Sequence, residues 1–211
     1  MQKVAILVDG GYYKACFKQK FRQHPSPENI INHCEEIISS PVLNNREMLR
    51  IYYYDCLPYD GKYKNPFSGQ YEDYSETHQH KENMEFINHL ISKPYVAFRK
   101  GILQLNGWKI QEHTLEDIIR RNRKVTRQDI REDFQQKRID MNVGMDIAWL
   151  AGKGLVDAMV LITGDTDFVP ALKFARREGL KVVINILTRD CSPYLKEHSD
   201  YILKLKPLIK R

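Results

Sequence analysis

Short apolar runs alternate along the chain with longer segments of helical period. Runs rich in apolar and aromatic residues, typical of buried strands, are found at 3–8, 50–54, 95–98, 158–163, 181–187 and 201–205. Apolar residues at spacings of three and four predict helices at 28–39, 77–91, 140–151 and 168–178. This alternation predicts an α/β, doubly wound fold, in which helices flank a mainly parallel sheet on both faces.

Two segments fall outside the alternation. Segment 57–79 contains two prolines and two glycines among many polar residues, which predicts a long loop. Asn106 and Gly107 stand between alternating apolar residues, which predicts a β-hairpin at 101–112. At 211 residues the chain is slightly longer than a typical domain. We therefore expect residues 1–211 to form a single domain with these two additions.

Composition narrows the class of protein. Hydrophobic residues make up 42% of the chain and charged residues 28%, which is typical of globular proteins and excludes a wholly disordered chain. The apolar runs are too short for a membrane span or a signal peptide. Cys16, Cys34, Cys56 and Cys191 lie far apart, so we expect reduced thiols and a cytoplasmic protein.

Positive charge is concentrated in one stretch. The formal net charge is +6, and segment 120–138 alone holds eight Lys or Arg residues against three Asp or Glu residues. Two interpretations remain open: a solvated helix face, or a track for a phosphate backbone. In the second, the candidate nucleic-acid-binding residues are Arg120, Arg121, Arg123, Lys124, Lys137 and Arg138.

Four aspartates occupy positions that favour a shared site. Asp9 follows the first strand, Asp165 and Asp167 follow strand 158–163, and Asp140 begins a helix. The carboxyl ends of parallel strands form the crevice where α/β proteins bind ligands. Each aspartate is also explained by helix N-capping alone. Two carboxylates about 4 Å apart repel by roughly 4 kcal/mol at an effective dielectric near 20, so a cluster of them favours Mg²⁺ or Mn²⁺.

Three motifs carry a resemblance to a known family. They are Val-Asp-Gly-Gly at 8–11, Lys-Arg-Ile-Asp at 137–140 with Asp146 six residues beyond, and Thr-Gly-Asp-Thr-Asp-Phe at 163–168. Together they resemble the NYN domain, LabA-like group, of the PIN-like nuclease superfamily. The resemblance implies a PIN-like α/β fold and a ribonuclease site that depends on divalent metal. The residues that match the family's acidic positions, and for which it implies catalytic and metal-binding roles, are Asp9, Asp140, Asp165 and Asp167.

The chain departs from the family pattern at two positions. Tyr12 stands where many members have Asn, and Arg138 replaces the Gly of a common Lys-Gly-Val-Asp motif. The first departure removes an amide side chain that would make a polar contact near the metal or phosphate. The second adds a positive charge that suits a polyanionic substrate.

Three further residues are candidate supporting groups. Asp146 matches a recurrent family aspartate, but helical geometry places it about 120° from Asp140. It is therefore expected in a supporting or surface position rather than as a direct ligand. Thr163 and Thr166 are expected either to bond the carboxylates of Asp165 and Asp167 or a bridging water, or to serve only as turn hydroxyls.

Three functions of different classes follow. The first is a metal-dependent endoribonuclease that hydrolyses RNA phosphodiester bonds; RNA as the substrate rests on the resemblance, because charge alone does not separate it from DNA. The second is a non-catalytic nucleic-acid-binding or adaptor module. The third is a metal-dependent enzyme that acts on a small phosphorylated ligand. Association as a homodimer is left open, since no stripe of residues specifies an interface.

Overall fold

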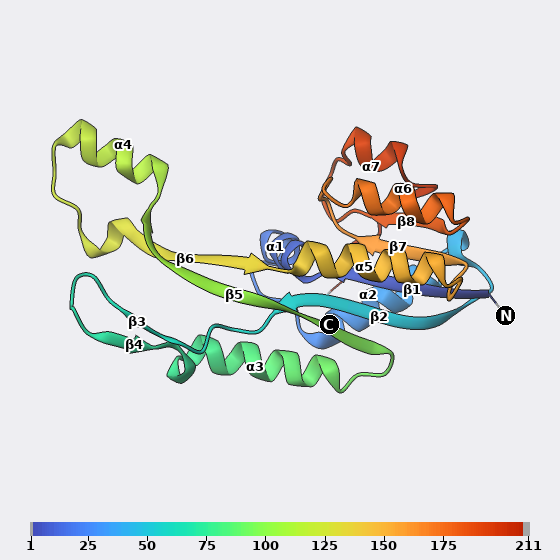
Figure 1. Cartoon of the computed structure of the whole chain (residues 1–211), viewed down its shortest axis with the longest axis horizontal. Helices are drawn as coiled ribbons and strands as arrows, with labels where there is room; N and C mark the ends of the chain where they lie inside the picture. Colours follow the sequence, from blue (N-terminus) through green and yellow to red (C-terminus); the bar gives the residue numbers. More distant parts are fainter. Residues whose placement is uncertain (1, 209–211) are drawn as a thin grey trace.

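A seven-stranded sheet forms the centre of the fold in the computed structural model, which describes residues 2–208 (Figure 1). In the order of the sheet, its strands are β6 (Ile130–Lys137), β5 (Val96–Ile110), β2 (Arg46–Cys56), β1 (Gln2–Asp9), β7 (Ala158–Ile162), β8 (Lys181–Asn185) and β9 (Tyr201–Leu203). Neighbouring strands are parallel except for β5 and β6, which are antiparallel. The predicted α/β fold with a mainly parallel sheet is confirmed.

Helices cover both faces of the sheet. On one side are α1 (Gly10–Phe21), α2 (Pro27–Ile38) and α3 (His78–Ile91), and on the other are α5 (Ile139–Gly152), α6 (Val169–Arg177) and α7 (Pro193–Glu197). Val4, Ile6 and Val8 of β1 pack with the first set, and Ala5 and Leu7 with the second. Because successive strand residues point to opposite faces, a strand covered on both sides is apolar throughout. This explains the continuous apolar run that predicts β1.

The predicted β-hairpin at 101–112 is wrong. β5 runs unbroken from Val96 to Ile110, and its register with β6 shifts between Leu105 and Trp108. Gly107 has φ of +123° within this irregularity. The Asn-Gly pair therefore serves a β-bulge rather than a turn, because both features need a residue that tolerates positive φ.

The predicted long loop at 57–79 is also only partly correct. It contains a two-stranded ribbon of β3 (Lys62–Lys64) and β4 (Tyr71–Asp73), then the 3-10 turn η2 (Tyr74–Glu76), and α3 begins at His78. The rings of Tyr59, Tyr74 and Phe134 pack against one another, with centroids 5.5–5.9 Å apart. Aromatic contact with β6, distant in sequence, thus orders a segment whose local composition indicates a loop.

β5 and β6 continue beyond the helical layers as a two-stranded arm, with α4 (Glu112–Arg121) at its tip (Figure 1). Two more 3-10 turns are η1 (Pro41–Leu43) and η3 (Arg127–Asp129). The apolar pattern did not predict α1, α4, β6 or α7. In α1, for example, Tyr13 and Phe17 are the large buried side chains, so the helix has little apolar periodicity to detect. Within residues 2–208, no helix is both long and apolar enough to cross a bilayer.

Candidate active site

Asp9 lies at the point where the strand order reverses. From β1 the chain crosses to β2 on one side, and later elements return to β7 on the other. β1 and β7 are parallel, and Val8 pairs with Ile162, so both strands end at the same edge. Asp9 is the last residue of β1, and Asp165 follows β7 after two intervening residues. These carboxylates therefore face the crevice that a doubly wound sheet leaves open for ligands.

Two hydrogen bonds hold the Asp9 carboxylate. Thr163 Oγ1 donates to Asp9 Oδ2 over 3.1 Å, and the Tyr12 backbone N–H donates to Oδ1 over 3.0 Å. The second bond makes Asp9 the N-cap of α1, so the capping interpretation is correct for this residue. Burial nevertheless raises the pKa of Asp9, and the negative charges of Asp165 and Asp140 raise it further, although both hydrogen bonds act in the opposite direction.

The loop after β7 is organised around Thr163, which is fully buried. Its Oγ1 accepts from the Asp165 backbone N–H (3.1 Å), and Asp165 Oδ1 accepts from the Asp167 backbone N–H (2.9 Å). Thr163 thus bonds the carboxylate of Asp9 rather than those of Asp165 or Asp167. Asp167 does not cap α6, whose N-cap is Phe168 without a side-chain bond. The Thr166 carbonyl accepts from Val169 N–H in the turn that begins the helix.

The arm brings Asp140 to the same edge. β6 returns along β5 until Lys137 pairs with Ile102, next to Gly101, which pairs with Cys56 near the end of β2. α5 begins two residues later, with Asp140 in its first turn. Partial burial raises the pKa of Asp140, and the charges of Asp165 and Asp167 add to the effect. The four predicted aspartates are therefore coupled electrostatically.

The donor set fits a hard divalent cation. The charged groups that raise the pKa values of Asp9 and Asp140 are carboxylates, and carboxylate oxygens are the ligands that Mg²⁺ and Mn²⁺ prefer. A cation at this edge would relieve the repulsion among them. Across residues 2–208, no three His, Cys, Asp or Glu side chains converge closely enough to hold an ion by themselves in this arrangement.

Asp146 lies apart from the acidic cluster. Its carboxylate accepts from Arg99 Nε (2.7 Å) and Nη2 (3.2 Å), and Tyr54 Oη donates to it over 2.8 Å. Arg99 also lies over the ring of Tyr52, 4.8 Å from its centroid. Asp146 therefore anchors α5 to β2 and β5.

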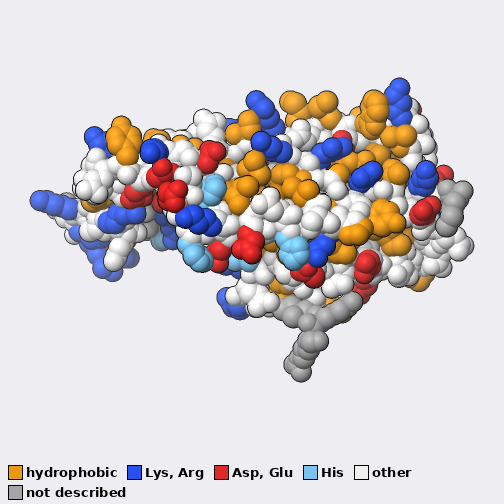
Figure 2. Space-filling model, turned by 90° about the horizontal axis from the view of Figure 1, so that it is seen from below, with side chains coloured by type: hydrophobic (Ala, Val, Ile, Leu, Met, Phe, Trp, Pro, Cys, Tyr) orange, Lys and Arg blue, Asp and Glu red, His pale blue; other side chains and the backbone are white. Residues whose placement is uncertain are grey.

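The predicted cations fall into two groups. Lys137 and Arg138 lie beside Asp140, whereas Arg120, Arg121, Arg123 and Lys124 lie at the tip of the arm, where basic side chains gather at the left of Figure 2. Arg123 is engaged locally, because its guanidinium bonds both oxygens of Asp129 (2.7 and 2.8 Å) and Asp117 (3.2 Å). Arg120 and Arg121 also pair with Asp117 but stay largely exposed. Of these six predicted cations, only Lys137 and Arg138 belong to the segment that leads into the acidic edge.

A buried ion pair beside this edge was missed from the sequence. Asp55, near the end of β2, is 2% exposed and pairs with Lys14 Nζ of α1 over 2.6 Å. The two residues line a cavity of about 90 Å³ together with Gln136, whose amide lies close to Gly11. A signal was present, because Asp55 directly follows predicted strand 50–54 and so falls on the rim where Asp9 lies.

Tyr12, which departs from the family pattern, links two loops. Its hydroxyl accepts from the backbone N–H groups of Leu187 (2.9 Å) and Thr188 (3.3 Å), in the loop after β8. Its ring lies so close to Gly164 that a Cβ there would stand 2.8 Å from Cε2. Tyr12 therefore fixes the loop after β8 against the loop that carries Asp165.

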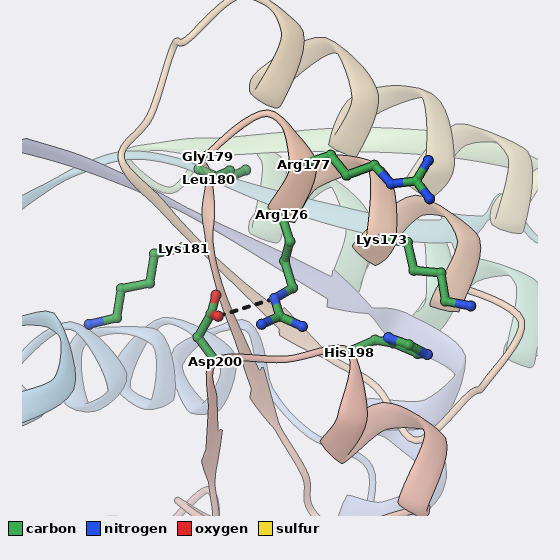
Figure 3. Close-up of a pocket in the computed structure, with 8 residues that line it drawn as sticks. All are labelled: Lys173, Arg176, Arg177, Gly179, Leu180, Lys181, His198 and Asp200. Atoms are coloured by element: carbon green, nitrogen blue, oxygen red, sulfur yellow. Dashed lines mark hydrogen bonds and ion pairs between the residues drawn. The ribbon is translucent and has the colours of Figure 1, made fainter.

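Another cavity, of about 680 Å³, lies between the end of α6 and the start of β8 (Figure 3). Its basic residues do not converge. Arg176 bonds Asp200 (3.1 Å), and Lys181 points away from Lys173 and donates to the Val42 carbonyl (3.0 Å). Since Lys181 begins β8, this cavity lies at the edge opposite to Asp9, and it is not part of the acidic site.

Comparisons with known proteins agree with the fold. The family model described as NYN domain matches residues 3–206. The uncharacterized protein MJ0482 of Methanocaldococcus jannaschii is 28% identical over 67 residues, which span 32% of this chain and 28% of that protein. A crystal structure of a protein of unknown function, VPA0982 from Vibrio parahaemolyticus, aligns with a TM-score of 0.53 and 15% identity, covering 96% of this chain and 91% of that one. At this identity the likeness shows a shared fold.

Proposed function

This chain belongs to the NYN domain family of the PIN-like superfamily, and we propose on that premise that it is a divalent-metal-dependent endoribonuclease. One observation carries the proposal. Asp9, Asp140, Asp165 and Asp167 come from distant parts of the sequence, and the charges of neighbouring carboxylates shift the pKa values of Asp9 and Asp140 at the switch point of the sheet. Repulsion among these carboxylates does not stabilise the fold. A bound cation that in turn binds a phosphodiester would account for their being close together.

The four aspartates would hold Mg²⁺ or Mn²⁺. When bound, such ions activate water at neutral pH and neutralise charge that develops on phosphate oxygens. The chain's own residues prepare the site. Thr163 and the Tyr12 N–H orient Asp9, while the Thr163 hydroxyl also fixes the backbone of Asp165. A carboxylate held in this way does not need to reorganise when substrate arrives.

Cations at the rim would attract the substrate. Lys137 and Arg138 closely precede Asp140 in the chain, and Lys14 is held near the end of β2 by Asp55. The exposed arginines of the arm add a second, more distant positive region. A nucleic acid that spans both regions would place its phosphates against the basic side chains of the arm. Such contacts weaken as the salt concentration rises.

The test is cleavage of single-stranded and structured RNA with Mg²⁺, with Mn²⁺ and with chelator. Asp9→Asn and Asp165→Asn should each lower the rate by more than about a hundredfold while the fold, checked by circular dichroism, is kept. Asp60→Asn, which changes an exposed aspartate in the segment after β2, should retain full activity.

Two outcomes would contradict the proposal. Cleavage that persists in folded Asp9→Asn and Asp165→Asn would remove these residues from the reaction. RNA binding that survives chelator, without metal-dependent cleavage of RNA, would indicate the non-catalytic binding module instead. DNA and small phosphate esters in parallel reactions separate the remaining substrate classes.

A further inference from the structure

A second cavity opens directly beside the acidic cluster. It has a volume of about 360 Å³ and lies between Asp9, Asp165 and the loop after β8. Small-molecule sites span about 300–1,000 Å³, so one planar ring system with its sugar fits the space. A phosphate held at the aspartates would leave the adjoining nucleoside within reach of this cavity.

The lining of the cavity disfavours an anionic group and offers an apolar surface to a planar one. Ile186, Cys191 and Leu195 are almost fully buried and give it an apolar floor. Thr188 and Ser192 add hydroxyl groups from the surrounding loop. Among the described residues that line it, none is Lys, Arg or His, so it does not suit a phosphate.

A third carboxylate in the lining, that of Asp190, defines the polarity that the ligand must have. Ionised carboxylates only accept hydrogen bonds, so a matching ring must present N–H donors. Guanine offers two adjacent donors, at N1 and at the 2-amino group, which match the two oxygens of one carboxylate. Adenine presents a single amino group beside a ring acceptor, and that acceptor would face the carboxylate unpaired.

The loop after β8, which carries Thr188 and Asp190, is preorganised by hydrogen bonds. The Tyr12 hydroxyl accepts two backbone N–H groups of the loop, from Leu187 and Thr188, and Thr188 Oγ1 donates to the carbonyl of Asp190. Gly164 leaves the room that the Tyr12 ring needs. A cavity held open by such bonds does not have to be ordered when the ligand binds.

We propose that this cavity is a nucleobase subsite that binds guanine of an RNA strand, with Asp190 as the residue that determines base preference and Tyr12 as a positioning residue. The proposal rests on the proposed function for its substrate class. It adds that cleavage occurs beside a particular base, which the acidic cluster alone does not specify.

The first experiment measures nucleoside binding without metal and without cleavage. Guanosine, inosine and adenosine are titrated in chelator, and backbone amide shifts of Gly164 and Thr188 report the location, with Gly179 at the opposite edge as reference. Guanosine should bind at least about fivefold more tightly than adenosine, which is the discrimination expected of a bidentate contact. Inosine lacks the 2-amino group and should bind more weakly than guanosine.

Variants assign the preference. Asp190→Asn should abolish the difference between guanosine and adenosine, and Asp60→Asn should keep it. Tyr12→Phe keeps the ring but loses the bonds to the loop, so guanosine binding should weaken while the fold remains. Equal binding of guanosine and adenosine, an unchanged preference in Asp190→Asn, or shifts that spare Gly164 and Thr188 would overturn the subsite.

The second experiment uses RNA strands with a single guanosine among uridines and adenosines. The wild-type protein should cleave next to the guanosine, and the Asp190→Asn variant should no longer prefer that position. Cleavage at all positions alike would overturn the subsite but leave the nuclease intact. Selective guanosine binding without cleavage of any RNA would support the subsite and contradict the nuclease.

Discussion

The hydroxyl of Thr163 donates to the carboxylate of Asp9 over 3.1 Å, joining the ends of β7 and β1 although the residues are 154 positions apart. The same oxygen accepts from the backbone N–H of Asp165. One fully buried hydroxyl therefore sets the position of two of the four aspartates at once.

Replacing this hydroxyl should impair cleavage more than folding. Thr163→Val keeps the shape of the side chain but removes both hydrogen bonds. We expect the cleavage rate to fall about ten- to a hundredfold, as for groups that orient metal ligands. Thr163→Ser restores the hydroxyl and should recover most of the activity. Full activity in folded Thr163→Val would show that Asp9 needs no support from this residue.

Arg138 holds a strained backbone conformation beside the site, with φ of +72°. A residue with a Cβ destabilises the folded state by about 1–2 kcal/mol in the left-handed region. Glycine avoids this strain, but its unfolded chain has more conformational entropy to lose, which offsets part of the gain. Arg138→Gly should therefore stabilise the protein by about 0.5–1 kcal/mol in urea unfolding. It should also weaken RNA binding and reduce the salt dependence by about one phosphate contact.

A matched variant separates charge from strain at this position. Arg138→Gln removes the guanidinium and keeps the positive φ, so it should lose the same RNA affinity without any gain in stability. RNA affinity that is unchanged in both variants would exclude Arg138 from the binding surface.

Asp146 should matter for stability and not for catalysis. Asp146→Ala leaves Tyr54 and Arg99 without their shared carboxylate, which should lower the free energy of unfolding by about 1–3 kcal/mol. The cleavage rate at a temperature where the variant is folded should stay within a few-fold of the wild type. A loss comparable to that of Asp165→Asn would instead place Asp146 in the acidic site.

His33 should make the fold sensitive to mild acid. It is 1% exposed, and Nε2 donates to the Leu205 carbonyl over 3.1 Å. Burial lowers its pKa to about 4, and the charge of Lys20 contributes in the same direction. The unfolded chain takes up a proton near pH 6.5, so stability is lost as pH falls from about 6.5 towards 4.

The size of this effect is measurable. The loss attributable to His33 should reach about 2 kcal/mol at pH 5 relative to pH 7. Urea unfolding of the wild type and of His33→Gln at both pH values isolates it, because the raised pKa values of Asp9 and Asp140 act equally in both proteins and in the opposite direction. An identical pH dependence in the two proteins would contradict the assignment.

The sequence by itself determined the layered core and the positions of Asp9, Asp165 and Asp167. A parallel strand buried on both faces is apolar throughout, and the residue that follows it lies at the edge where ligands bind. Both features can therefore be predicted from the order of residues within a short segment. The family motifs added Asp140. The predicted hairpin failed because Gly107 permits positive φ in a bulge as well as in a turn.

Only the tertiary structure decided which distant segments meet. The return of β6 along β5 brings Asp140 to the acidic edge, and the same fold pairs Asp55 with Lys14 and binds Tyr12 to the loop after β8. Strand register and side-chain partners depend on contacts between residues far apart in the chain. Local periodicity holds no information on them, which is why the acids and the candidate Thr163 were predicted, while the pairing of Thr163 with Asp9 and that of Lys14 with Asp55 were not.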